Sequence, residues 1–88
     1  MIDVTRPVPC RKFASVPLET QMKKIHSEVG EAWEALNRNR GMFAEEITDV
    51  IVACTTMLDM IGYDEAARIE KMREVNEKNR VRGYWGDD

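Results

Sequence analysis

Residues 28–49 read EVGEAWEALNRNRGMFAEEITD and contain two acidic motifs, EVGE at 28–31 and EITD at 46–49, on either side of a polar break. Within each motif the carboxylates are three residues apart, so on a helix they lie on one face with Cβ atoms about 5–6 Å apart. Mg²⁺ prefers oxygen ligands and is commonly held by a few carboxylates together with substrate phosphates. The sequence therefore predicts a cation site formed by Glu28, Glu31, Glu46 and Asp49.

Both acidic motifs lie in segments with the period of an amphipathic helix, predicted over residues 17–37 and 42–61. On a helical wheel the apolar residues of these segments span roughly 20° to 140°, while the acids of each pair lie at about 0° and 300°. Segment 37–41 is polar and short, which predicts a connection between antiparallel neighbours. If the two apolar stripes face one another, the acid pairs converge on one rim of a shared core. Cys54 is expected to belong to that core.

A third helix is predicted from Asp64, which can cap it, to about Arg82. Gly62 and Gly83 are suitable left-handed residues to end the second and third helices. The apolar face of the third helix gives way to Asn76, Asn79 and Arg80. These polar residues either mark where the helix leaves the core or contact a nucleotide.

The predicted fold is all-α, an antiparallel bundle of three main helices in a single domain over residues 17–83. Residues 1–16 form a proline-containing arm, either an ordinary terminus or a segment that packs on a partner or on the site. Residues 84–88 form a tail whose aromatic pair is expected to anchor the chain end. Because so short a chain buries only about 60–65% of its surface, we expect it to need help from a partner.

Composition excludes several classes of partner. The net charge is −3 and no broad basic face is present, which disfavours nucleic-acid binding. The longest nearly apolar run, residues 50–61, is far shorter than the ~20 residues of a membrane span. The N-terminus does not have the pattern of a signal peptide. A cytoplasmic location without membrane attachment is therefore expected.

The choice of cation follows from the donor types. Di-iron helical bundles use Glu-x-x-His motifs, whereas the single histidine, His26, points away from the acids on the wheel. Carboxylate ligands alone favour Mg²⁺, with Mn²⁺ as a common substitute.

Three segments within residues 20–85, KKIHSEVGEAWEAL, AEEITDVIVA and KMREVNEKNR, resemble the MazG-like all-α nucleoside triphosphate pyrophosphohydrolases. Relatives of that family include dimeric dUTP and dCTP pyrophosphatases and phosphoribosyl-ATP pyrophosphohydrolase. The resemblance implies Mg²⁺-dependent hydrolysis of (deoxy)nucleoside triphosphates at the α–β bond to monophosphate and pyrophosphate, for nucleotide-pool cleaning or control. It also implies that the helices are completed into a four-helix-type bundle by a second subunit, in a homodimer or homotetramer.

The resemblance further implies roles for individual residues. Glu28, Glu31, Glu46 and Asp49 would hold the metal, and Glu31 or Glu46 would act catalytically by accepting a proton. The implied substrate-binding residues are Lys71 and Arg80 for phosphates, Asn76 or Asn79 for sugar or base, and Trp33 for base stacking. Trp33 is alternatively a core residue.

Two other readings of the same residues stay open. One is a non-catalytic helical dimer that serves as a protein-interaction or nucleotide-binding module, with the acids as surface charge. The other is hydrolysis of phosphoribosyl-ATP. The pattern of residues leaves base and sugar preference and the number of metal ions undecided.

Overall fold

The computed structural model describes residues 1–86, and over that range the chain is all-helical, with no strand. Its elements are η1 (Arg11–Phe13), α1 (Leu18–Arg38), η2 (Arg40–Met42), α2 (Phe43–Met60) and α3 (Glu65–Val81). The prediction of an all-α chain with three main helices is confirmed. Of the predicted tail 84–88, Asp87 and Asp88 lie outside the described residues.

The helix ends follow the predicted signals. Asp64 caps α3, since its carboxylate accepts a hydrogen bond of 2.9 Å from the Ala67 N–H. Gly62 and Gly83 follow α2 and α3 with φ of 95° and 75°, a left-handed conformation that suits glycine. Pro17 precedes the first residue of α1 rather than occupying it. The local sequence therefore determines where each helix begins and ends.

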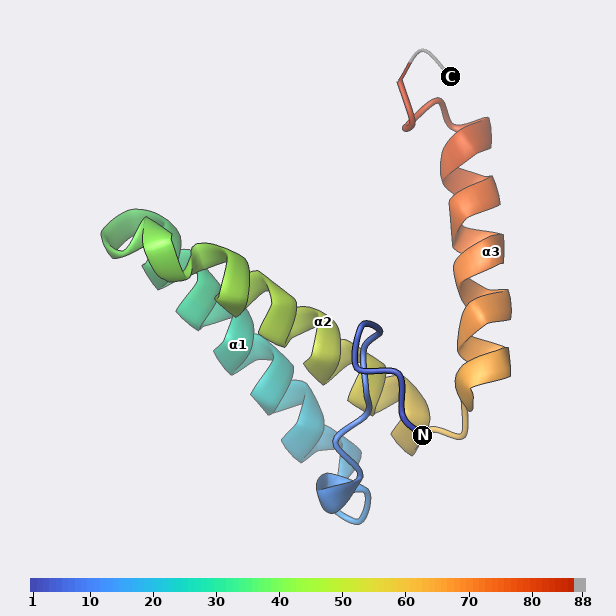
Figure 1. Ribbon diagram of the computed structural model, residues 1–88, viewed down its shortest axis with the longest axis horizontal. Helices are drawn as coiled ribbons and strands as arrows, with labels where there is room; N and C mark the ends of the chain where they lie inside the picture. Colours follow the sequence, from blue (N-terminus) through green and yellow to red (C-terminus); the bar gives the residue numbers. More distant parts are fainter. Residues whose placement is uncertain (87–88) are drawn as a thin grey trace.

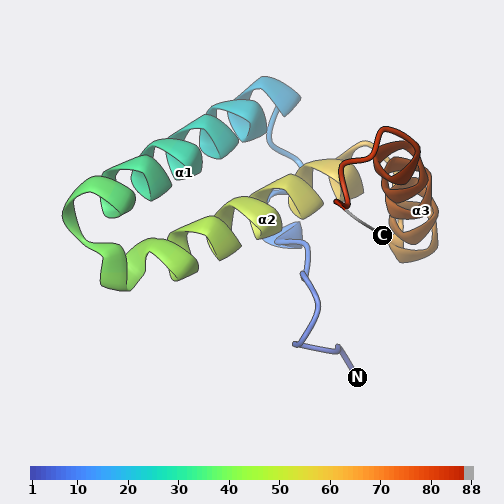
Figure 2. The ribbon, with the colours of Figure 1, turned by 90° about the horizontal axis from the view of Figure 1, so that it is seen from above.

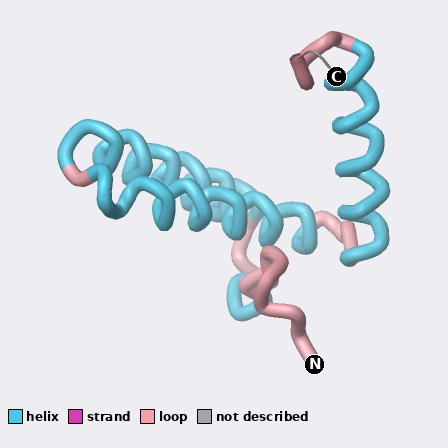
Figure 3. Tube along the Cα trace, turned by 45° about the horizontal axis from the view of Figure 1, so that its top comes forward, coloured by secondary structure: helices cyan, strands magenta, loops and turns pink. Residues whose placement is uncertain are grey.

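Two helices form the body of the chain and the third leaves it. Helices α1 and α2 lie side by side and antiparallel, joined by the tight connection at η2 (Figures 1 and 2). Helix α3 extends away from this pair after the turn at Gly62 (Figure 1). The N-terminal arm lies beside the end of the helix pair from which the chain leads on to α3 (Figure 3). One chain thus presents an antiparallel helix pair with a separate third helix.

The α1–α2 interface is narrow and made of small or polar residues. Its buried members are Gln21, Glu28, Ala32 and Ala35 from α1, with Ala53 and Thr56 from α2. On the wheel the α1 members lie at roughly 340° to 40°, on the acid side of the apolar stripe rather than at its centre. The two stripes therefore face one another along one edge only, because the alanines allow the helices to approach there.

The large apolar side chains of α1 and α2 furthest from the contact are left exposed, whereas those nearer to it are half-buried, among them Ile25, Leu36, Phe43, Val50 and Met57. The residues of this apolar face are Leu18, Met22, Val29 and Trp33 on α1 and Ile47, Ile51 and Cys54 on α2. In an antiparallel pair, stripes rotated in the same sense from the contact project to the same side, so they form one face. Cys54 is exposed there and not in the core. No helix within residues 1–86 is long and apolar enough to cross a membrane.

The close packing of α1 against α2 at small residues can be tested by substitution. We expect Ala53→Leu to destabilise the protein by about 1–3 kcal/mol in denaturant titration, because added methylenes separate the two helices. Ala53 is 7% exposed, whereas Ala44 on the same helix is exposed. Ala44→Leu is therefore the matched control and should leave the midpoint almost unchanged. Equal effects of the two substitutions would contradict the close approach at Ala53.

Candidate metal centre

Three of the predicted carboxylates meet at the α1–α2 interface. Glu28, Glu46 and Asp49 each place one oxygen so that the three atoms lie within 4.8 Å of one another. Glu28 belongs to the buried interface and is only 8% exposed, while Asp49 is open to solvent. The edge contact between the helices explains the convergence, because it turns Glu28 of α1 directly towards α2.

Glu31 lies at the margin of this cluster. It is exposed and is not one of the three residues whose oxygens come together. Its charge still acts on the cluster, because it is among the acids that raise the pKa of Glu46. The structure therefore places three of the four predicted ligands together and the fourth nearby.

Glu46 is the acid of the cluster whose negative charge is least compensated by neighbouring groups. Its Oε2 atom is buried and has no hydrogen-bond partner among residues 1–86. Burial raises the pKa of Glu46, and the charges of Glu31, Asp49 and Glu28 raise it further. A buried carboxylate oxygen without a partner is costly. A cation at this point would satisfy the oxygen and balance the acids, so the donor set fits an oxygen-preferring ion such as Mg²⁺.

One positively charged side chain reaches the cluster. Lys24 Nζ lies 2.9 Å from Glu28 Oε1. The pKa of Lys24 is raised by its hydrogen bond to Glu28, by the charge of Glu28, and then by Glu31 and Asp49. Lys24 thus faces the acids from one turn earlier on α1.

A cavity of about 260 Å³ opens beside the acids, between the helix pair and the N-terminal arm. Lys24, Glu28 and Asp49 contribute its polar wall, and Cys10 and Phe13 of the arm line it as well. At its floor the Gln21 side-chain amide donates a hydrogen bond of 3.0 Å to the Ala53 carbonyl. The cavity is large enough to take a small anionic group next to the carboxylates.

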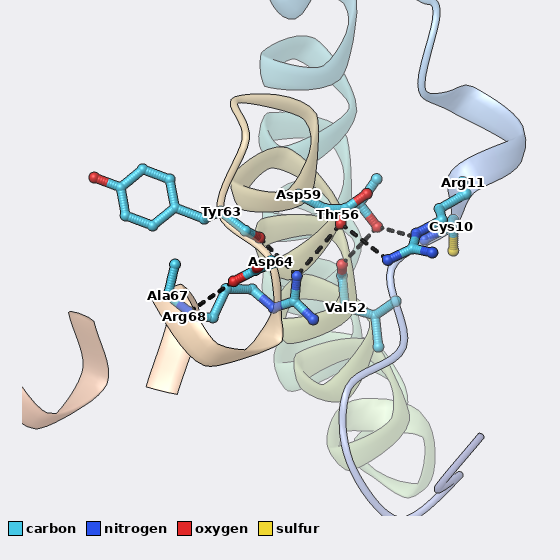
Figure 4. Close-up of polar contacts among 9 residues, drawn as sticks. All are labelled: Cys10, Arg11, Val52, Thr56, Asp59, Tyr63, Asp64, Ala67 and Arg68. Atoms are coloured by element: carbon cyan, nitrogen blue, oxygen red, sulfur yellow. Dashed lines mark hydrogen bonds and ion pairs between the residues drawn. The ribbon is translucent and has the colours of Figure 1, made fainter. Parts of the chain in front are cut away.

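The arm is held against the helices by a network of polar contacts (Figure 4). The Cys10 N–H donates to Thr56 Oγ1 at 2.9 Å. Asp59 Oδ1 lies 3.4 Å from both the Arg11 and the Arg68 guanidinium, and Arg68 also donates to the Tyr63 carbonyl at 2.7 Å. Asp59 therefore links the arm, α2 and α3 at one corner.

Sequence reasoning missed this corner. Asp59 is the single acid within the nearly apolar run 50–61, and its side chain is only 15% exposed. A charged residue in such a setting is normally paired. That signal could have indicated that arginines from other segments converge on it.

The predicted substrate residues of α3 lie away from the acid cluster. Lys71 pairs with Glu74 at 3.2 Å, and Arg80 Nε donates to Glu77 at 3.0 Å. Asn76 lines a separate surface hollow with Trp85, and the Asn79 carbonyl accepts the Tyr84 N–H at 2.9 Å.

Trp33 is 66% exposed on the apolar face, so the alternative that it belongs to a core within one chain is wrong. Neither Trp33 nor any of the four α3 residues is among those that line the cavity beside the acids.

Comparison with known protein families, with curated proteins and with solved structures found no match to this chain.

The unbalanced charge of Glu46 predicts an unusual pH dependence. The folded-state pKa of Glu46 lies above the ordinary value of 4.5, so folding favours the protonated carboxyl. The stability that this protonation provides is lost as pH rises through the folded-state pKa. In EDTA at neutral pH, Glu46→Gln should therefore raise the unfolding midpoint. The advantage of the variant over the wild type should shrink as pH falls towards 4.5.

Glu45→Gln is the matched control for this experiment, because Glu45 is the exposed neighbouring acid. It should not reproduce the pH-dependent gain. A lower midpoint for Glu46→Gln than for the wild type at neutral pH would show that Glu46 is already balanced in the metal-free protein.

Proposed function

We propose that this chain is a Mg²⁺-dependent nucleoside triphosphate pyrophosphohydrolase, cleaving (deoxy)nucleoside triphosphates at the α–β bond to monophosphate and pyrophosphate. The observation that carries the proposal is the meeting of Glu28, Glu46 and Asp49 around a buried carboxylate oxygen that has no partner within residues 1–86. The resemblance of the acidic motifs to the MazG-like family supplies the reaction. A role in cytoplasmic nucleotide-pool cleaning or control follows from the same resemblance.

The proposal assigns separate tasks to the acids. Glu28, Glu46 and Asp49 hold the cation, and Glu31, whose charge acts on Glu46, is the fourth ligand of the proposal. Bound Mg²⁺, or Mn²⁺ in its place, would neutralise phosphate charge and activate water. Glu31 or Glu46 accepts the proton of the attacking water.

The active form in this proposal is a homo-oligomer. The buried apolar residues within one chain are Ala32, Ala35 and Ala53, too few for a chain this short to be stable alone. A second copy is the best-matched cover for the apolar face, because an isologous contact buries the same residues on both subunits. Two antiparallel pairs joined in this way form a four-helix-type bundle. The polar residues of α3 would then approach an acid cluster only from a neighbouring subunit.

Assembly through the apolar face can be tested by placing a charge on that face. Ile51 is 49% exposed on the apolar face, and Ile51→Asp should raise the subunit dissociation constant by about 100-fold or more, since burying an unpaired carboxylate costs several kcal/mol. Sedimentation equilibrium measures the change. Ser27→Asp, at an exposed position on the opposite side of α1 from Val29, is the control and should assemble normally. A wild-type protein that stays monomeric at micromolar concentration would exclude this assembly.

Turnover of a substrate panel tests the activity. We expect pyrophosphate release from at least one nucleoside triphosphate in the presence of Mg²⁺. Asp49→Asn should reduce the rate by about 100-fold or more with circular dichroism unchanged, because loss of even an outer-shell residue of a metal site costs about 10–100-fold. Glu45→Asn, which changes an exposed acid of the same helix, should retain activity.

The same panel separates the alternatives. Turnover of phosphoribosyl-ATP with no turnover of nucleoside triphosphates would replace the substrate assignment. A folded protein that turns over no nucleotide and binds no Mg²⁺ by calorimetry would support the non-catalytic helical dimer instead.

A further inference from the structure

We propose that Lys24 occupies the place of the cation at Glu28 in the metal-free protein and moves to a substrate phosphate when the cation binds. This inference rests on the proposed function and adds to it a phosphate-binding residue on α1. It assigns to Lys24 two alternating partners, one carboxylate of the metal centre and one anion in the adjacent cavity.

The first partner is already in contact. Lys24 Nζ lies 2.9 Å from Glu28 Oε1, and the Glu28 side chain is only 11% exposed. Lysine–glutamate pairs one turn apart are common on helix surfaces and weak there. This pair differs because Glu28 is also one of the three clustered carboxylates. The ammonium group therefore balances part of the charge that the cluster brings together.

Lys24 balances the cluster incompletely. It supplies a single positive charge beside three clustered carboxylates, and Glu46 Oε2 still has no partner within residues 1–86. A divalent cation between Glu28, Glu46 and Asp49 supplies twice the charge and has ligands from both helices. The two positive charges repel at such short range, so occupation of the centre by the cation releases Lys24 from Glu28.

The second partner is provided by the cavity beside the acids. Lys24 is the cationic member of the residues that line this cavity of about 260 Å³. Its other charged lining residues are Glu28 and Asp49, which a bound cation would neutralise. The flexible lysine stem lets the ammonium reach a new partner without backbone movement. The released Lys24 is thus placed to bind a phosphate group held next to the cation.

Calorimetry with Mg²⁺ alone tests the first half of the proposal. Lys24→Gln removes the competing ammonium and should tighten Mg²⁺ binding about threefold or more, as expected for the loss of a modest ion pair. Lys24→Arg keeps the charge and should bind Mg²⁺ as the wild type does. Lys23→Gln is the matched control, because Lys23 is the exposed neighbouring lysine and forms no ion pair within residues 1–86. It should also bind as the wild type does.

Inorganic pyrophosphate in saturating Mg²⁺ tests the second half. Lys24→Gln should weaken pyrophosphate binding about tenfold, because a charge-assisted hydrogen bond to phosphate is lost, whereas Lys23→Gln should not. Tighter Mg²⁺ binding together with weaker pyrophosphate binding is the result expected, and a purely structural role of Lys24 would not move the two affinities in opposite directions.

Three results would overturn the proposal. Unchanged or weaker Mg²⁺ binding by Lys24→Gln would show that Lys24 does not compete with the cation. Unchanged pyrophosphate binding would show that it does not transfer to phosphate. Failure of the wild-type protein to bind Mg²⁺ would instead overturn the proposed function itself.

Discussion

The close contact between α1 and α2 is the constraint on which the rest of the structure depends. Alanines at positions 32, 35 and 53 let the two helices approach along one edge of each apolar stripe. The same edge carries Glu28 on α1 and the acids of the EITD motif on α2. The packing of small residues thus brings the carboxylates close together. Because the carboxylates repel one another, a cation would be favourable among them.

This contact also gives the helix pair two different faces. Because the small residues occupy the interface, the large apolar side chains furthest from it stay exposed and form the apolar face. The wheel positions place the cavity, Lys24 and the arm on the opposite side of the helix pair. In the proposed oligomer, assembly and binding chemistry would therefore use different faces of one helix pair.

The Asp59 corner gives the arm a fixed place in this arrangement. Its two arginine contacts come from the arm and from α3, so one carboxylate connects the arm with the start of α3. The arm is consequently a wall of the cavity beside the acids and not only a chain terminus.

The sequence by itself determined the helix boundaries, the caps at Asp64 and Gly62, and the pairing of carboxylates within each motif, because these depend on neighbours along the chain. It also predicted that the two motifs meet. Only the tertiary structure decided how each helix is rotated towards the other, which leaves Glu31 at the margin and Trp33 exposed. A helical wheel relates residues within one helix, whereas the rotation between helices depends on side-chain size at the contact. The direction of α3 and the contacts of Asp59 likewise depend on residues far apart in the sequence.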